Sequence, residues 1–350
     1  MSGLGRAVWR VVARWEVILI VLIVATGIWS ATLSSFFLQR ANLLDLLTPY
    51  IFLGLLAFGL TFVVIAGEID ISVVSTMAVA AASFAHLWNA GVNVWLAALA
   101  ALVVGTGLGL VNGLLIGVLN LPSLAITLGT LAAYRGLAYL ILGGEAISGF
   151  PTSFTNIGGG YIRNELPVAL LVLCAFALVL GLLLHATRFG RYLYALGSNR
   201  EAARYSGIPV TVVRVTVFAL AGLMAGFAAI TYLGYYGSVQ ADAGSGSELI
   251  DVVTAVVLGG VDIFGGSGSM LGVLLALILV AELRNGMQLA NVSGATQDMV
   301  IGGLLIAAIL AGNALRAAQG GRLRIKRAGS RKEVTQKSQL DSPVQATIET

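Results

Sequence analysis

The sequence predicts an all-α polytopic membrane protein of about ten transmembrane helices, with room for re-entrant segments and with both termini in the cytoplasm. Of its 350 residues, 58% are hydrophobic and only 10% are charged, whereas soluble domains carry about 25% charged residues. Lysine and arginine gather at the N-terminus, between residues 188 and 214, and in the C-terminal tail. Basic segments stay on the cytoplasmic face, and an even number of spans would place all three regions there.

Ten apolar runs define the expected transmembrane domain, residues 16–316. They cover residues 16–33, 46–66, 73–88, 95–119, 121–142, 167–185, 212–235, 250–258, 270–284 and 298–315. The first run is long and no small-x-small cleavage site follows it, so we interpret it as a retained span behind a cytoplasmic segment 1–15, not as a signal peptide. The eighth run is shorter than the roughly 20 residues that a spanning helix needs, which favours a re-entrant segment there.

The tail after residue 316 differs in composition from the rest of the chain. Residues 317–350 are basic and polar, which predicts a disordered cytoplasmic tail. The net charge of +4 comes mostly from such loops and tails, so it does not indicate nucleic-acid binding.

The longest charged interruption between two apolar runs is residues 188–214, with five arginines and one acid, Glu201. Ser198 or Asn199 can cap a short helix there, and Gly207 followed by Ile208 and a proline should end it. A capped helix at the membrane surface suits docking of a partner. A solvated basic loop is the alternative.

Six polar residues near membrane depth are candidates for a translocation route: Glu68, Asp70, Asn112, Arg135, Asp251 and Asp262. Arg135 lies inside an apolar run, where its charge is costly unless it snorkels, pairs or faces water. Asn112 lies beside glycines spaced every four residues, a pattern that favours close helix packing, and we expect its amide to bond to a neighbouring helix. Several acids fall at predicted span ends, where interfacial solvation would account for them.

Two segments of the chain resemble each other. Residues 63–77 read VVIAGEIDISVVSTM, and residues 256–270 read VVLGGVDIFGGSGSM. Transporters are commonly built from repeats, with the route near the repeat interface, although chance similarity among small apolar residues is an alternative. A true repeat predicts that the turns of Asp70 and Asp262 approach each other near the cytoplasmic mouth of the route.

Several function classes lack their residues. The sequence has no G-x-x-x-x-G-K-[ST] motif for ATP phosphates, no metal-spaced histidines and cysteines, and no catalytic set for an intramembrane enzyme. A secondary transporter driven by protons or sodium should bury more coupling groups within its spans. We therefore expect no cofactor bound by this chain, and energy that arrives from a partner at residues 188–214.

The segment GSNREAARYSGIP resembles the coupling segment of the membrane permeases of bacterial ABC sugar importers, the ribose, xylose, arabinose and rhamnose type. VVIAGEIDIS is similar to that family's V-x-x-x-G-G-I-D-L-S signature. ITLGTLAAYRGLAYLILGG and TAVVLGGVDIFGGSGSMLG resemble two further family segments. The resemblance covers nearly the whole chain, and within the family it is closest to rhamnose and autoinducer-2 import permeases.

The resemblance implies a bacterial inner-membrane subunit that is not an enzyme and that moves a monosaccharide or a related small molecule. Its partners would be a second permease, in a homodimer or a paralogous heterodimer, a cytoplasmic ABC ATPase that uses ATP and Mg, and a periplasmic sugar-binding protein. A stand-alone secondary transporter or channel for a small polar solute is the alternative. The residues implied to dock the ATPase are Gly197, Ser198, Asn199, Glu201, Ala202, Ala203, Ser206, Gly207 and Ile208.

Two residues depart from the family's pattern. Glu68 stands where the signature has its second glycine, and Val74 stands where glycine is usual. Both make the turn bulkier, so we expect a changed route shape or a partner permease that supplies the more typical half. Because the binding protein would select the sugar, we expect no aromatic-plus-carboxylate sugar pocket in this chain.

Overall fold

The computed structural model describes residues 15–163, 165–240, 243–244 and 246–311. The expected cytoplasmic segment 1–15, apart from Trp15, and the expected tail 317–350 lie outside these residues. Residues up to Leu305 form one compact unit, to which the contacts below belong.

Almost all regular structure in the described residues is helical, in agreement with the predicted all-α class. The helices are α2 (Trp15–Leu33), α3 (Arg40–Asp45), η1 (Thr48–Tyr50), α4 (Ile51–Ile65), α5 (Val73–Asn89), α6 (Val94–Gly117), α7 (Ser123–Leu142), α8 (Thr152–Gly159), α9 (Val168–Ala186), α10 (Arg188–Ser198), α11 (Arg200–Tyr205), α12 (Val210–Tyr236), α13 (Glu248–Leu258), α14 (Met270–Leu289) and a last helix, Gly294–Ala311. Two-residue strands form two antiparallel pairs, β1 (Ile147–Ser148) with β4 (Ser238–Val239), and β2 (Tyr161–Ile162) with β3 (Leu166–Pro167).

Eight helical stretches in the described residues are long and apolar enough to cross a membrane, and one of them, Arg40–Ile65, joins α3, η1 and α4. They correspond to eight of the ten expected runs, so the protein is polytopic. The two others are shorter helices: α5 has 17 residues and α13 has 11. At 1.5 Å per residue α13 is about 16 Å long, roughly half of a 30 Å hydrocarbon core. The short eighth run is therefore not a conventional span, as its length predicted.

The core of the compact unit forms around α4 and α12. Fourteen of the fifteen residues of α4 are buried, and α4 packs against α12, which also packs against α5 and α6. A Cβ added at Gly105 or Gly109 of α6 would overlap the backbone of α12, and one added at Gly222 of α12 would overlap α6. The predicted packing role of the α6 glycine stripe is therefore confirmed.

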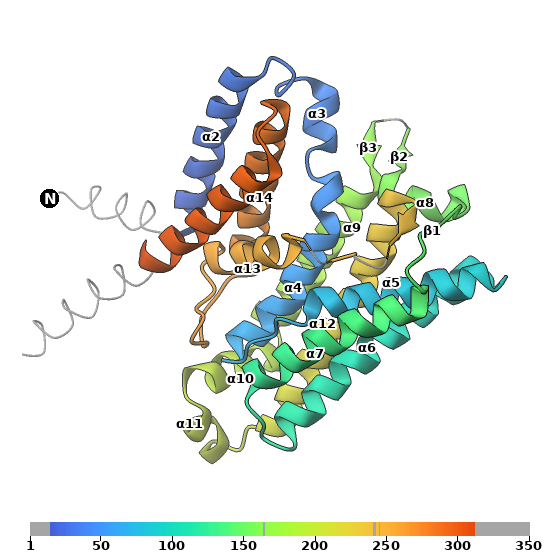
Figure 1. Cartoon of the computed structure of the whole chain (residues 1–350). Helices are drawn as coiled ribbons and strands as arrows, with labels where there is room; N and C mark the ends of the chain where they lie inside the picture. Colours follow the sequence, from blue (N-terminus) through green and yellow to red (C-terminus); the bar gives the residue numbers. More distant parts are fainter. Residues whose placement is uncertain (1–14, 164, 241–242, 245, 312–350) are drawn as a thin grey trace, which may run out of the picture. The chain divides into compact units, whose positions relative to one another are not determined.

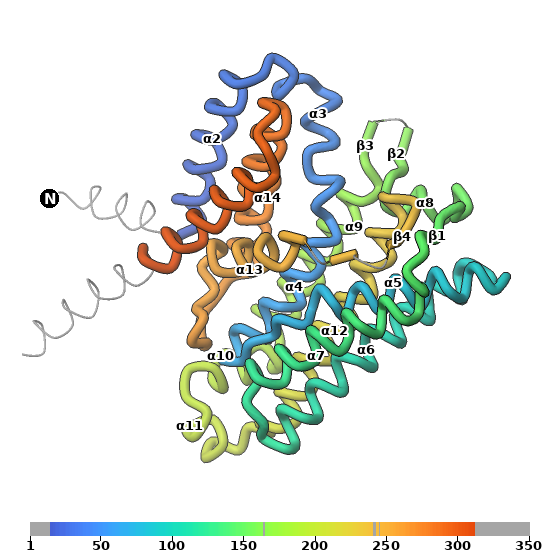
Figure 2. The backbone as a smooth tube through the Cα atoms, in the orientation of Figure 1, coloured from blue at the N-terminus to red at the C-terminus, as the bar shows by residue number. Residues whose placement is uncertain are grey.

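Figure 1 shows α10 and α11 at one end of this unit and the β2–β3 hairpin with α8 at the opposite end. The arginines of α10 and α11 favour a cytoplasmic location for the first end, the orientation expected from the sequence. Helix α13 lies about midway between the two ends, and the chain then descends to the end that holds α10 and α11 before α14 begins (Figure 2). Helix α14 packs along α2, and α5 packs against both α6 and α7.

Candidate functional site

Within the coupling segment, which we define as residues 187–209, the short helix α11 begins and ends with the signals read from its sequence. The side chain of Asn199 accepts a hydrogen bond from the amide of Ala202 at 2.9 Å, so Asn199 and not Ser198 caps α11. Gly207 has a φ of +77°, and its amide bonds to the carbonyl of Arg204. These contacts confirm the short helix and its stop.

A second helix of this segment, α10, was not predicted. Its cap is Thr187, which accepts from the amide of Gly190, and its apolar residues Leu193 and Leu196 are buried one turn apart. That i, i+3 spacing was the available signal. Arg214 was assigned to the loop but belongs to the second turn of α12, where it is buried.

Three backbone segments meet around Gly197 of α10. The amide of Gly266 donates to the carbonyl of Ile65, at the end of α4, over 2.9 Å. A Cβ added at Gly197 would overlap both of those backbone atoms, and one added at Gly265 would lie 2.7 Å from the Cα of Gly67. We call this contact of α10 with the turns after α4 and α13 the glycine junction. Only glycine lets three backbones approach so closely.

The two turns in the glycine junction share one design. Helices α4 and α13 end at Gly67 and Gly260, with φ of +77° and +82°, and the residue after each glycine donates its amide to the carbonyl five residues earlier, at 3.1 and 3.3 Å. This is the Schellman pattern of helix termination. The repeated sequence thus produces a repeated turn, and the predicted approach of the two turns is confirmed.

The echoed aspartates, Asp70 and Asp262, also repeat each other's role. Each carboxylate accepts from the amide two residues further on, at 2.8 and 3.0 Å respectively. Such Asx turns reverse the chain locally. Asp262 stands one position closer to its glycine than Asp70 does. Asp70 is 4% exposed, so its turn is enclosed by protein, whereas Asp262 is partly exposed.

Asn112 links the first turn to two membrane helices. Its amide nitrogen donates to the hydroxyl of Ser72 at 2.9 Å, and that hydroxyl donates to Asp70 at 2.6 Å. On its other side, the hydroxyl of Tyr134 donates to Asn112 at 3.3 Å. Asn112 is 1% exposed. The expected bond to another helix is confirmed, and the side chain serves packing between α5, α6 and α7.

Glu68 forms a buried ion pair with Arg214. The Nε atom of Arg214 lies 2.5 Å from the carboxylate of Glu68, and the two side chains are 3% and 10% exposed. Asn120, after α6, accepts from both Arg214 at 3.0 Å and Arg200 at 2.6 Å. The side chain of Glu68 therefore turns away from the glycine junction, and the bulk that it adds does not prevent the backbone approach there.

This network also reaches the coupling segment through Arg200 of α11. Partial burial and the neighbouring charge of Arg214 lower the pKa of Arg200, while Glu68 opposes the shift. In α10, Tyr194 donates its hydroxyl to the carbonyl of Gly268 at 2.8 Å, and burial raises the pKa of this phenol to about 12. Its proton therefore stays in place at neutral pH. Helix α10 therefore contacts the turns by backbone and side chain, whereas α11 reaches the turn after α4 through Asn120 and Arg214.

The remaining candidate residues lie elsewhere. Asp251 of α13 pairs with Arg284 at 2.6 Å, and Arg284 also contacts Asp298 at 2.9 Å. Arg135 is exposed on α7 and has no hydrogen bond or ion pair within the described residues. Of the three alternatives, pairing therefore does not occur within the described residues. No group of His, Cys, Asp or Glu that could hold a metal occurs among the described residues.

Interfacial solvation was the wrong explanation for three of the acids. Glu68, Asp70 and Asp251 are 8%, 4% and 4% exposed, and each has a partner: Arg214, Ser72 and Arg284 respectively. Val74, the other departure, packs at the start of α5, where a Cβ added at Gly244 would lie 2.6 Å from it.

The long apolar helices, the coupling segment and its contacts define a class of protein. This class is a multi-pass membrane transport subunit whose coupling segment contacts two turns of the membrane bundle. The family described as the permease component of the branched-chain amino acid transport system matches residues 42–309. The chain belongs to this family. It is a permease component of a bacterial, binding-protein-dependent ABC import system, and a transport subunit rather than an enzyme.

Curated relatives agree with this assignment. The chain is 36% identical over 303 residues to the autoinducer 2 import system permease protein LsrD of Klebsiella pneumoniae subsp. pneumoniae, which covers 85% of this chain and 91% of the relative. It is 36% identical over 307 residues to the proteins of the same name from Escherichia coli K12 and Shigella flexneri, covering 86% and 92%. No solved structure matches.

Proposed function

We propose that this chain is the permease subunit of an ATP-driven importer for a monosaccharide or a similarly small, polyol-like molecule. The solute would pass from a periplasmic binding protein to the cytoplasm, with ATP and Mg used by a separate ABC ATPase. A second permease, either a copy of this chain or a paralogue, would complete the route in the inner membrane. The relatives named as autoinducer 2 import permeases support a solute of this class.

The glycine junction carries this proposal. Force applied to α11 from the cytoplasm would reach Gly197 through α10, and Gly197 touches the turns after α4 and α13 at once. The turn after α4 leads into α5, and the turn after α13 leads into α14. A displacement of a few tenths of an ångström at such a packed contact must move both turns, because close-packed interiors transmit strain.

The outer surface of the coupling segment is suited to receive that force. Glu201, Arg204 and Ser206 are exposed on or beside α11, and Tyr205 is 90% exposed. Phe264 projects from the neighbouring turn and is 80% exposed. Aromatic residues and arginine are enriched at protein interfaces relative to the rest of the surface, so we infer that Phe264 docks the ATPase together with α11.

Reconstitution tests the proposed function directly. Purified chain, a co-encoded ATPase and a co-encoded binding protein are placed in liposomes, and the uptake of radiolabelled L-rhamnose, D-ribose and autoinducer 2 is measured. We expect uptake of at least one of them to require both the binding protein and ATP hydrolysis. Uptake that proceeds without ATP and collapses with a proton or sodium ionophore would instead support the stand-alone transporter.

A further inference from the structure

The described residues between α12 and α13, 237–240, 243–244 and 246–247, have no regular structure apart from strand β4. The chain leaves α12 at Gly237, which has a φ of +64°, and reaches Ser247 at the start of α13, which Figure 1 shows about midway between the two ends of the unit. Irregular backbone at membrane depth is tolerated where protein buries it or where it lines a wet cavity. Transporters commonly build their solute sites at such a place, beside an interrupted helix near the midplane.

Two adjoining cavities lie along this segment. One has a volume of about 340 Å³ and is lined by the end of α12 and by Ser238, Gln240, Ala243, Gly244, Gly246 and Glu248. The other has a volume of about 330 Å³ and lies between α4, α12, α13 and α14. Both are lined by Tyr236 and Glu248, so we call them together the Tyr236–Glu248 cavity. Volumes at the low end of the 300–1,000 Å³ range suit a small ligand.

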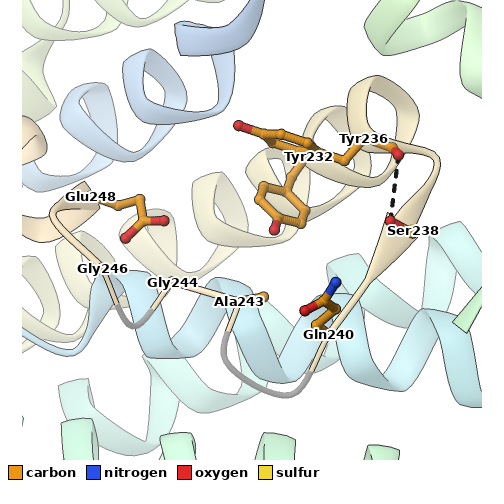
Figure 3. A pocket seen from close by; sticks show the side chains of 8 residues that line it. All are labelled: Tyr232, Tyr236, Ser238, Gln240, Ala243, Gly244, Gly246 and Glu248. Atoms are coloured by element: carbon orange, nitrogen blue, oxygen red, sulfur yellow. Dashed lines mark hydrogen bonds between the residues drawn. The ribbon is translucent and has the colours of Figure 1, made fainter. Parts of the chain in front are cut away.

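The lining combines flat aromatic surface with hydrogen-bonding groups. The rings of Tyr232 and Tyr236 lie 4.6 Å apart between centroids, and Figure 3 shows Glu248 on one side of them and Gln240 on the other. The Oε2 atom of Glu248 is buried and has no hydrogen-bond partner within the described residues. A buried carboxylate oxygen without a donor is costly, which indicates that a ligand or water supplies the donor.

The charges in the lining select the class of ligand. Glu248 and Asp251 contribute two carboxylates, and the guanidinium of Arg284 already contacts Asp251 and Asp298. An anionic ligand would be repelled by these carboxylates, and the charge of Arg284, which is already neutralised by its acidic partners, would not offset that repulsion. A ligand with several hydroxyl groups supplies donors to Glu248 and Gln240 and has C–H faces that can lie against the tyrosine rings.

We propose that the Tyr236–Glu248 cavity is a binding site for an uncharged polyhydroxy solute the size of a monosaccharide. The proposal rests on the proposed function and adds to it a site within the permease, where the resemblance had led us to expect none. The cavity would hold the solute between its release from the binding protein and its entry into the cytoplasm.

Saturation-transfer NMR on the full-length chain with its ATPase in lipid nanodiscs tests the site without transport. The probes are L-rhamnose, D-ribose and xylitol, with D-gluconate as the anionic comparator. We expect saturation transfer to at least one uncharged probe and none to D-gluconate. Glu248→Gln and Tyr236→Leu should each raise the half-saturating concentration of the probe about tenfold. This is the loss of affinity expected for one hydrogen bond to a charged group or one aromatic contact.

Glu145→Gln and Tyr139→Leu are the matched controls, because both residues are exposed and lie outside the cavity. Melting temperatures of all four variants check that the fold is kept. Equal transfer in Glu248→Gln and Glu145→Gln, equal transfer to D-gluconate, or no transfer to any uncharged probe overturns the proposal. ATP-dependent uptake is measured separately in liposomes, so its loss in the wild type counts against the proposed function and not against this site.

Discussion

Replacement of Gly197 by valine should separate the coupling segment from the two turns and uncouple ATP hydrolysis from uptake. A Cβ at this position overlaps the carbonyl of Ile65 and the amide of Gly266, and neither backbone atom can rotate away. Overpacking of this kind costs about 1–3 kcal/mol. A cost of that size, applied to the joined state alone, lowers its population relative to the separated state by about 5- to 150-fold.

The measurement is the ratio of solute imported to ATP hydrolysed in liposomes that contain the complete importer. We expect Gly197→Val to lower this ratio at least fivefold while the chain still inserts and still retains its ATPase, because α11 and Phe264 are unchanged. Gly91→Ala, in the turn between α5 and α6, is the control, because Gly91 lies outside the coupling segment. It strains a residue with a φ of +83°, at a cost of about 1–2 kcal/mol, but a Cβ there meets no described atom within 4 Å.

Gly91→Ala should therefore lower the melting temperature and leave the ratio near the wild-type value. A normal ratio in Gly197→Val would show that the glycine junction does not transmit force. Equal losses in both variants would show that general destabilisation, and not this contact, determines the coupling.

Three further predictions follow from individual side chains. Glu68→Gln should destabilise the chain by about 3–5 kcal/mol, because it leaves the charge of Arg214 buried and unpaired. In a melting experiment, the double variant Glu68→Gly/Arg214→Leu should recover most of this lost stability. A double variant that loses the sum of the two single losses would contradict the pairing. Arg135→Leu should keep solute uptake within about twofold of the wild-type rate. Arg135 is seven residues from the outer end of α7, a distance of about 10 Å over which its side chain can snorkel. A large loss of uptake would mean that another subunit pairs with Arg135. In a background without the native cysteine, Ser267→Cys should react with a charged thiol reagent added from the cytoplasmic side. Ser72→Cys should not react, because Ser72 is fully buried. Reaction of Ser267→Cys from the periplasm alone would contradict the expected orientation in the membrane.

Local signals in the sequence predicted local structure well. The cap at Asn199 and the stop at Gly207 depend on residues within one turn of each other, so their chemistry could be read directly. The short eighth run predicted that α13 does not cross the membrane, because length is a property of the sequence itself. The echo between residues 63–77 and 256–270 predicted a shared turn, since the same glycine spacing imposes the same left-handed residue.

Contacts between distant residues could not be predicted in the same way. Glu68 and Arg214 are 146 positions apart, and no periodicity indicates that an acid in a turn meets an arginine in a helix. The error about Arg214 had a local cause as well, because α12 begins at Val210 and the preceding proline left its start ambiguous. The Tyr236–Glu248 cavity was missed because its lining comes from four helices and an irregular segment, none of which carries a sugar-site pattern alone.

The unusual glutamate at position 68 and the buried arginine at position 214 are best understood as one feature. The related signature has glycine at this position of the turn. Burial of a carboxylate there without a cation would cost a large free energy, and burial of Arg214 without the carboxylate would be similarly costly. Since Arg214 also shares Asn120 with Arg200 of the coupling segment, the pair adds a charged connection between the turn and α11. A chain with glycine at position 68 would have only the glycine junction there. Glu68 therefore distinguishes this turn, in which a buried ion pair supplements the backbone contact, from the glycine-based turn of the related signature.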